Sequence, residues 1–147
     1  MKEQYADIIT TPHQSTLIKE ITSVLQNKPP IIGAYIFGSF LRSEIYHDID
    51  IALYLNFDPE PYERFKFASK IGHDVEVQIH PRTHVDVRIL NNAPITFAYE
   101  VLSTGLLLNC SNDEIITTFE TDILVRYLDM QPWYETLDNL YREKLMA

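Results

Sequence analysis

Asp48 and Asp50 are the residues whose types and spacing point most directly to chemistry. They lie in the segment DIDIALYL, where polar and apolar residues alternate as in a strand, so both carboxylates point to one face. Like charges this close favour a bound cation. Carboxylate oxygens suit Mg²⁺, which commonly keeps positions for substrate phosphates. Two such ions would stabilise both the attacking and the leaving oxygen of a phosphoryl transfer, so the pair predicts metal-dependent phosphate chemistry.

Gly38 and Ser39 precede this strand by eight residues and follow the apolar run IIGAYIF, which predicts a strand buried on both faces. A glycine lets a phosphate approach the backbone, and a serine offers its N–H and hydroxyl to phosphate oxygens. The D-x-D pattern alone also fits an exposed strand edge whose aspartates only keep it soluble. The order of buried strand, Gly-Ser turn and Asp pair favours a phosphate site.

Other elements must hold this segment in place. Thr11 and Pro12 predict the N-cap and first turn of a helix that ends before Pro29-Pro30. The stretch from Pro59 to His80 has two readings, because VEVQIH alternates like a strand. Apolar residues at helical spacing over the same stretch favour one long helix instead. These are Phe65, Ala68, Ile71, Val75 and Ile79.

The downstream half predicts a third strand VDVRIL, a helix over NAPITFAYEVLST that ends at Gly105, and a short strand LLLN. A long helix follows from Asn112, kinked or broken at Pro132. The predicted fold class is therefore α/β (α+β), a small mixed sheet flanked by helices. We expect one domain over 1–147, with an N-terminal helix over about 1–30, the sheet and its helices over 31–110, and a helical tail over 112–147.

Composition limits the function. The net charge is −9 and the pI is near 4.9, which excludes a broad basic surface for nucleic acid. The four glycines cannot form G-x-G-x-x-G or a Walker-type loop, and the single Cys110 excludes a disulfide within the chain. The first residues lack the features of a secretory signal, and no apolar run is long enough to cross a membrane. These features predict a cytoplasmic protein.

The combination of G-S and D-x-D across two strands resembles the nucleotidyltransferase superfamily of DNA polymerase beta, and the small size points to its minimal, MNT-type branch. VDVRILNNAPITFAYEVLSTGLLL resembles that branch's third-carboxylate strand with the helix and strand after it. FETDILVRYLDMQPWYE resembles its C-terminal helix. The similarity runs from about Ile31 to Tyr141 and implies a polymerase-beta-like fold with a C-terminal helical extension.

By this resemblance, Gly38 and Ser39 bind the nucleotide triphosphate, and Asp48 and Asp50 are metal ligands. Asp86 is the third carboxylate, a metal ligand that helps to deprotonate the attacking hydroxyl. A structural reading of Asp86 is a pair with Arg88 on the same strand face.

Arg42 matches a basic position that follows the Gly-Ser in MNT proteins, where it contacts phosphate, although a solvated loop arginine fits equally well. The chain departs from the family in three ways. The loop between Gly-Ser and D-x-D has eight residues instead of ten, Ser43 stands at a usual glycine, and His47 replaces the usual Ser or Asp.

Several other groups of residues receive structural interpretations. His80 and His84 flank Pro81 and are expected to be solvated loop residues. Asp74 and Glu76 are expected to solvate the surface of the long helix. An apolar stripe on the tail is expected to pack in the core, with a partner or self-association as the alternative. It comprises Trp133, Tyr134, Leu137, Leu140 and Tyr141.

The resemblance implies a Mg²⁺-dependent enzyme that transfers AMP from ATP to a hydroxyl and releases pyrophosphate. MNT proteins act as antitoxins of HEPN-type RNase toxins, and some attach AMP to a Tyr of the toxin. The acidic charge supports a protein acceptor over nucleic acid. Two alternatives stay open: an antitoxin that neutralises its partner by contact alone, and a small-molecule nucleotidyltransferase of the aminoglycoside type.

Overall fold

Strands β1 (Ile31–Phe37) and β2 (Asp48–Leu55) form the centre of a four-stranded sheet in the order β3-β2-β1-β4. The computed structural model describes residues 11–146. Strand β1 pairs antiparallel with β2 and with β4 (Leu106–Cys110), whereas β2 pairs parallel with β3 (His84–Ile89). The sheet is therefore mixed, as the sequence predicts.

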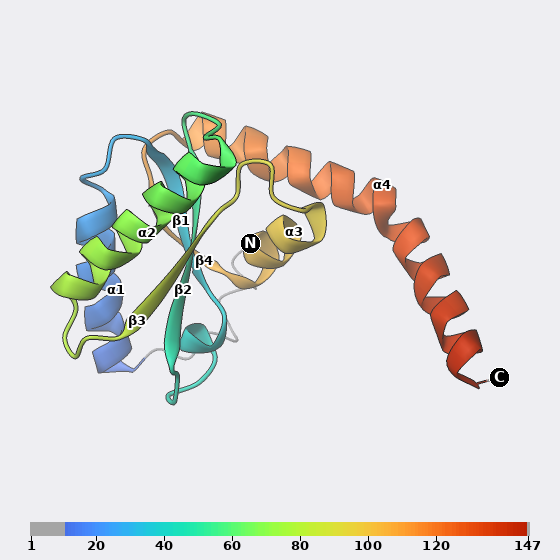
Figure 1. The fold of residues 1–147 in the computed structure, drawn as a ribbon, viewed down its shortest axis with the longest axis horizontal. Coiled ribbons are helices and arrows are strands. Elements are labelled where there is room, and N and C mark those ends of the chain that lie inside the picture. The colour runs from blue at the N-terminus through green and yellow to red at the C-terminus, as the bar shows by residue number, and fades with distance from the viewer. Residues whose placement is uncertain (1–10, 147) are drawn as a thin grey trace.

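Helices cover both faces of the sheet (Figure 1). Helices α1 (Pro12–Leu25) and α2 (Pro61–Gln78) pack on one face, together with Ile49, Ile51 and Leu53 of β2. Helix α3 (Ile95–Thr104) and the first part of α4 (Asp113–Met146) pack on the other face. The alternation along β2 thus assigns its even-numbered positions to the α3 side of the sheet, where Asp48 and Asp50 begin the strand.

The stretch from Pro59 to His80, which fits a strand or a helix by sequence, forms helix α2, as its helical spacing favours. A parallel connection between β2 and β3 needs a crossover segment, and α2 supplies it. Ile71 and Val75 are buried in the core, and Gly72 allows close approach because a Cβ there would lie 3.2 Å from the Val85 carbonyl oxygen. Phe65 departs from the expected pattern, since it is 69% exposed.

Helix α4 continues through Pro132 without a break. Figure 1 shows it leaving the body of the molecule and changing direction in its red, C-terminal half. Proline removes one backbone donor and crowds the preceding turn, which bends a helix. Of the two predicted outcomes at Pro132, the kink is the one observed.

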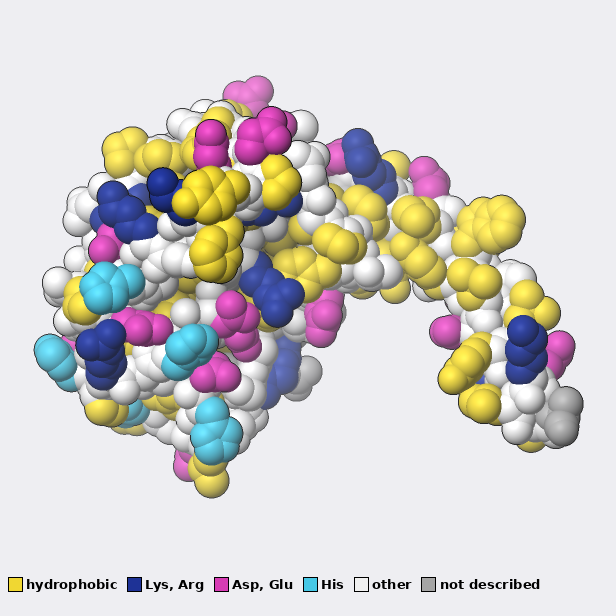
Figure 2. All heavy atoms as spheres, viewed as in Figure 1, with side chains coloured by type: hydrophobic (Ala, Val, Ile, Leu, Met, Phe, Trp, Pro, Cys, Tyr) yellow, Lys and Arg dark blue, Asp and Glu magenta, His cyan; other side chains and the backbone are white. Residues whose placement is uncertain are grey.

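The expectation that the tail stripe packs in the core is wrong for four of its five residues. Trp133 is 71% exposed, and Leu137, Leu140 and Tyr141 are each more than half exposed. Figure 2 shows apolar side chains along the half of α4 that projects from the body of the molecule. None of the described helices has the length and apolarity of a membrane span.

Candidate active site

The parallel register of β2 and β3 brings the predicted carboxylates together. Asp50 lies opposite Asp86, and Asp48 lies opposite His84. Partners in register share a face of the sheet, so Asp48, Asp50 and Asp86 all lie on its α3 side, at the start of β2. The strand period and the pairing of β2 with β3 therefore place three carboxylates in one small area.

The Gly-Ser turn lies directly beside this area. Phe37 pairs with Asp50, and Gly38 follows with φ +81°, a conformation that favours glycine. A Cβ on Gly38 would overlap the Asp50 carboxylate. Ser39 then opens the short 3₁₀ helix η2 (Ser39–Leu41) and is exposed. The turn predicted to hold phosphate and the carboxylates predicted to hold metal are thus immediate neighbours.

Gln14 holds the loop that follows the Gly38-Ser39 turn through hydrogen bonds, a role that the sequence did not reveal. Its side-chain amide donates to the carbonyl oxygens of Phe40 at 2.7 Å and Ser43 at 2.9 Å, and Gln14 is only 1% exposed. Its Oε1 accepts from the Thr11 N–H, which completes a capping box at the start of α1. The local signal, T-x-x-Q after a predicted N-cap, indicates the capping box but not the contacts with the loop.

The pKa of the Asp50 carboxyl lies above its ordinary value. Burial raises its pKa, and the Asp86 and Asp48 carboxylates raise it further. Arg88 and His84 act in the opposite direction and lower this pKa. The site therefore gathers negative charge at Asp50 that the surrounding side chains only partly neutralise.

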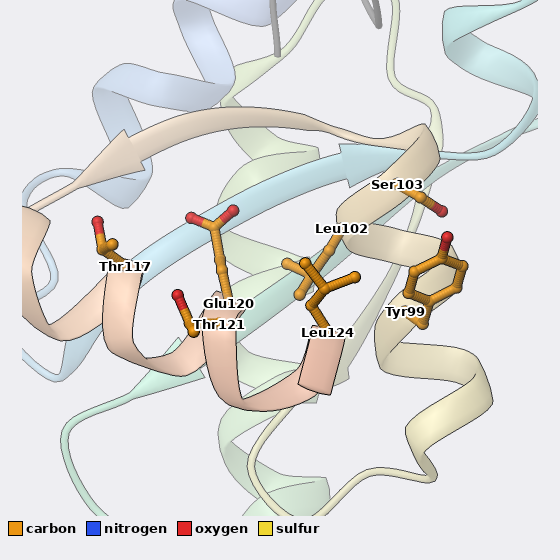
Figure 3. A pocket seen from close by; sticks show the side chains of 7 residues that line it. All are labelled: Tyr99, Leu102, Ser103, Thr117, Glu120, Thr121 and Leu124. Atoms are coloured by element: carbon orange, nitrogen blue, oxygen red, sulfur yellow. The ribbon is translucent and has the colours of Figure 1, made fainter. Parts of the chain in front are cut away.

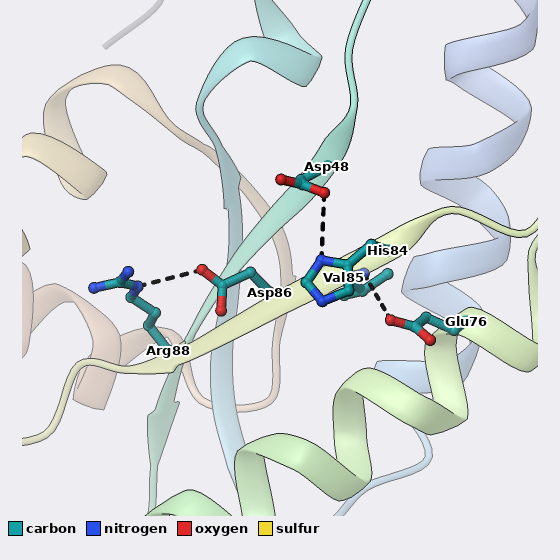
Figure 4. Close-up of polar contacts among 6 residues, drawn as sticks. All are labelled: Asp48, Glu76, His84, Val85, Asp86 and Arg88. Atoms are coloured by element: carbon teal, nitrogen blue, oxygen red, sulfur yellow. Dashed lines mark hydrogen bonds and ion pairs between the residues drawn. The ribbon is translucent and has the colours of Figure 1, made fainter.

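His84 and Arg88 contact the carboxylates of Asp48 and Asp86, respectively (Figure 4). The His84 Nδ1 lies 3.3 Å from the Asp48 Oδ1, and the Arg88 Nε lies 3.4 Å from the Asp86 Oδ2. The alternative reading of Asp86, a pair with Arg88, is thus present in the structure. His84 is exposed, but the expectation that it is a loop residue is wrong, because it is the first residue of β3.

The donor chemistry of this area fits a hard divalent ion, because all three predicted ligands offer carboxylate oxygens. Within the described chain, however, no three or more His, Cys, Asp or Glu side chains converge closely enough to hold a metal ion. Two of the three carboxylates have partners of their own, since Asp48 contacts His84 and Asp86 contacts Arg88.

Hydrogen bonds of Arg42 and Ser43 tie the shortened loop to its neighbours. Arg42 donates from Nη2 to the Thr104 carbonyl oxygen at 2.8 Å, at the end of α3. Ser43 accepts from the Ile45 N–H and, through its carbonyl, from Gln14. His47 is exposed immediately before Asp48. Arg42 thus has a contact of its own in the absence of phosphate.

The expectation that Asp74 and Glu76 only solvate α2 is wrong. Asp74 pairs with Lys28 at 2.8 Å and ties α2 to the chain after α1. Glu76 accepts from the Val85 N–H at 2.9 Å and lies 3.5 Å from Arg82. Both acids face different directions, as the helix reading requires, but each stabilises a specific contact.

Two hollows lie near these elements. A groove of about 350 Å³ between α2 and the edge of β3 includes His84 and Asp86 in its lining. A cavity of about 280 Å³ between α3 and α4 contains none of the predicted site residues (Figure 3). It is bordered by the Glu120 carboxyl, whose pKa is raised by burial. The groove at β3 is therefore the hollow that adjoins the carboxylates.

Known structures share this fold. A chain of tri-AMPylated Shewanella oneidensis HEPN toxin in complex with MNT antitoxin matches with a TM-score of 0.64 and 21% identity, over 91% of this chain and 99% of that one. A toxin–antitoxin structure with AMP-PNP matches with a TM-score of 0.65 and 20% identity, over 88% and 98% of the two chains. No curated protein matches the sequence.

The family model described as "Polymerase beta, Nucleotidyltransferase" matches residues 19–114. This range begins in α1 and ends at the start of α4, so it includes the whole sheet and all three carboxylates. The chain therefore belongs to the polymerase beta nucleotidyltransferase family.

Proposed function

We propose that this protein is a Mg²⁺-dependent nucleotidyltransferase that transfers AMP from ATP to a tyrosine hydroxyl of a HEPN-type RNase toxin and so acts as its antitoxin. The observation that carries the proposal is the position of Asp48, Asp50 and Asp86 on one sheet face, in register on two neighbouring strands, beside the Gly38-Ser39 turn. Family membership supports nucleotidyl transfer as the reaction.

In this proposal Asp48, Asp50 and Asp86 hold Mg²⁺, which supplies charge stabilisation for the phosphates when bound. Gly38 and Ser39 contact the triphosphate through the backbone and the Ser39 hydroxyl. Arg42 exchanges its contact with the Thr104 carbonyl for a phosphate oxygen.

The acceptor oxygen forms a bond to the α-phosphorus, and the bond from that phosphorus to the oxygen bridging to the β-phosphate breaks. Pyrophosphate leaves, and the hydroxyl proton passes to Asp86. The products are the AMP ester of the acceptor and pyrophosphate.

The acceptor and partner assignments draw on the similar structures. One contains a HEPN toxin that carries AMP groups in complex with an MNT antitoxin, and another contains the ATP analogue AMP-PNP. Both cover nearly the whole length of this chain's described fold. A protein acceptor also agrees with the net charge of −9, which repels a polynucleotide.

The projecting half of α4 offers a surface for this partner. Its exposed apolar side chains include Trp133, Leu137 and Leu140. Over residues 113–146, α4 carries eight acidic and three basic side chains. An RNase must attract RNA and therefore presents positive charge, which complements the acidic α4. A second copy of α4 carries the same negative charge and would be repelled.

A second candidate is an antitoxin that neutralises the toxin by contact without transferring AMP. The specific observation in its favour is that His84 and Arg88 occupy the Asp48 and Asp86 carboxylates. In this candidate the ion pairs are permanent and the site takes no metal.

The two candidates differ in a transfer assay. The purified protein is incubated with α-labelled ATP, Mg²⁺ and the HEPN-type protein encoded by a neighbouring gene. We expect label on the partner, lost on addition of EDTA and in Asp48→Ala, with partner binding retained in that variant. Tight binding without label would support the contact-only antitoxin and refute the transfer reaction.

A further inference from the structure

The outer edge of β3 is an open strand edge beside the candidate active site. β3 is the last strand of the sheet order, so only its inner edge pairs, with β2. The Leu90 N–H donates inward to the Leu53 carbonyl oxygen, and the backbone groups of a strand alternate in direction. The N–H and C=O groups of Val85, Val87 and Ile89 therefore point outward.

Helix α2 covers part of this edge and leaves the next part open. The Val85 N–H is taken by Glu76, and the Val85 carbonyl oxygen lies against Gly72. Across residues 11–146, no group donates to or accepts from the outward backbone of Val87. The groove of about 350 Å³ opens at this point and is lined by Val87 and Asp86.

The pleat of the sheet determines what would lie beside Asp86. Residues in register on neighbouring strands share a face, with Cβ atoms roughly 4.5–5.5 Å apart. Asp50 is the neighbour of Asp86 on the β2 side. A segment that pairs with Val87 from the open side would place one of its own side chains next to Asp86, on the same face.

The lining of the groove limits the chemistry of such a segment. The lining contains two acidic side chains, Glu76 and Asp86, and two histidines, His73 and His84. These acids favour a neutral or basic peptide over an acidic one. The exposed ring of Phe65 comes from α2, on the other side of the sheet from Asp86, and offers an apolar contact to a side chain of the segment that points away from Asp86.

We infer that the β3 edge is the acceptor site: an extended peptide segment of the partner protein pairs with the Val87 backbone and presents its tyrosine hydroxyl beside Asp86. The inference rests on the proposed function and specifies where and in what conformation the acceptor binds. Recognition then comes from main-chain hydrogen bonds, and the groove accepts the side chain next to the tyrosine, which points to the α2 side of the sheet.

Val87→Pro tests the strand pairing. Proline removes the outward N–H but breaks no bond to β2, and edge strands tolerate proline at such positions. Val87→Thr is the matched control, because it keeps the N–H and nearly the same shape. The probe is the random copolymer poly(Lys,Tyr), with labelled AMP transfer from ATP as the readout.

We expect Val87→Pro to raise the KM for poly(Lys,Tyr) by about tenfold or more and to change the KM for ATP by less than about twofold. Val87→Thr should behave as the unaltered protein does. Poly(Glu,Tyr) should be the poorer acceptor, because the acids of the groove repel it. An unchanged acceptor KM in Val87→Pro, or a preference for poly(Glu,Tyr), would overturn the inference.

A second pair of variants covers the case in which Val87→Pro does not fold. Ser69→Trp fills the groove from an exposed position of α2, and Lys70→Trp adds the same side chain one position away, outside the groove lining. Only Ser69→Trp should raise the acceptor KM, and equal values for the two variants would refute the acceptor site.

The outcomes also separate this inference from the proposed function. If the unaltered protein labels the HEPN-type partner but not poly(Lys,Tyr), the inferred acceptor site at the β3 edge is wrong and the proposed function stands. If it labels neither, the proposed function itself fails and the inference falls with it.

Discussion

Asp50 occupies space that a side chain on Gly38 would need. A Cβ built on Gly38 would overlap the Asp50 carboxylate, and Gly38 holds φ at +81°. Gly38 directly follows β1, whose last residue, Phe37, pairs with Asp50 of β2. The glycine of the phosphate turn therefore sets the position of a candidate metal ligand as well as the path of the backbone.

Gly38→Ala tests this relationship. The conformation of Gly38, φ +81° and ψ −158°, is essentially restricted to glycine and costs another residue about 1–3 kcal/mol, and the added methyl also displaces Asp50. We expect kcat/KM for AMP transfer to fall by about 100-fold, because small displacements of reacting groups have effects of that size. Gly33→Ala is the control: its Cβ would crowd the Ile116 side chain, and Gly33 pairs with Tyr54, at the end of β1 away from Asp50. Equal activity losses in the two variants would show that the effect is general destabilisation.

The raised pKa of Asp50 leads to a pH-dependent stability of the metal-free protein. Burial, Asp86 and Asp48 raise this pKa, so the folded state binds the proton more tightly than the unfolded chain does. Ionisation of Asp50 therefore opposes folding. Its unfavourable contribution appears as the pH rises from the ordinary Asp pKa of about 3.9 through the raised value, and it is fully present above that value.

Asp50→Asn removes this contribution. We expect its melting temperature without metal to exceed that of the unaltered protein by about 1–3 °C at neutral pH, with the difference vanishing in acid. Differential scanning calorimetry with EDTA over a pH series measures it, with Asp129→Asn on α4 as the exposed control. A large fall in the melting temperature of Asp50→Asn would mean that this carboxylate is structural.

Gln14 links the capping of α1 to the phosphate turn, and the two roles can be separated. Gln14→Ala leaves the Phe40 and Ser43 carbonyls without their donor, at a cost of about 2–4 kcal/mol, and should raise the KM for ATP by about tenfold. Thr11→Ala breaks the same capping box but leaves these bonds, so it should cost about 1 kcal/mol without changing this KM. The KM for ATP decides whether Gln14 positions the turn.

The sequence predicts the face of β2 on which Asp48 and Asp50 lie, because strand alternation is local. It does not predict that His84 lies beside Asp48. The expected third strand starts at Val85, whereas β3 starts one residue earlier, at His84. This additional residue pairs with Asp48, the first residue of β2. The place of Asp86 opposite Asp50 depends on a parallel pairing that no local pattern encodes, and the family resemblance supplied it.

Gln14 and the tail illustrate two other limits of sequence reasoning. The capping-box pattern around Gln14 is local, but its bonds to Phe40 and Ser43 span 26 and 29 positions. Helical periodicity identifies the apolar stripe that contains Leu137, but it cannot tell burial in the chain's own core from burial against another protein. The structure shows that α4 extends beyond the body of the molecule, so its contacts with the core end before Leu137.

The exposed stripe of α4 leads to a prediction about the partner. Leu137 is 59% exposed, so Leu137→Glu should change the free energy of unfolding by no more than about 0.5 kcal/mol. If α4 docks the HEPN-type protein, the buried charge should weaken binding by about tenfold or more, as measured by titration calorimetry. Asn139→Glu adds the same charge about 200° around the helix and should bind like the unaltered protein. Equal affinity for both variants would place the interface elsewhere, and a homodimer lost only in Leu137→Glu would show that the stripe binds a second copy.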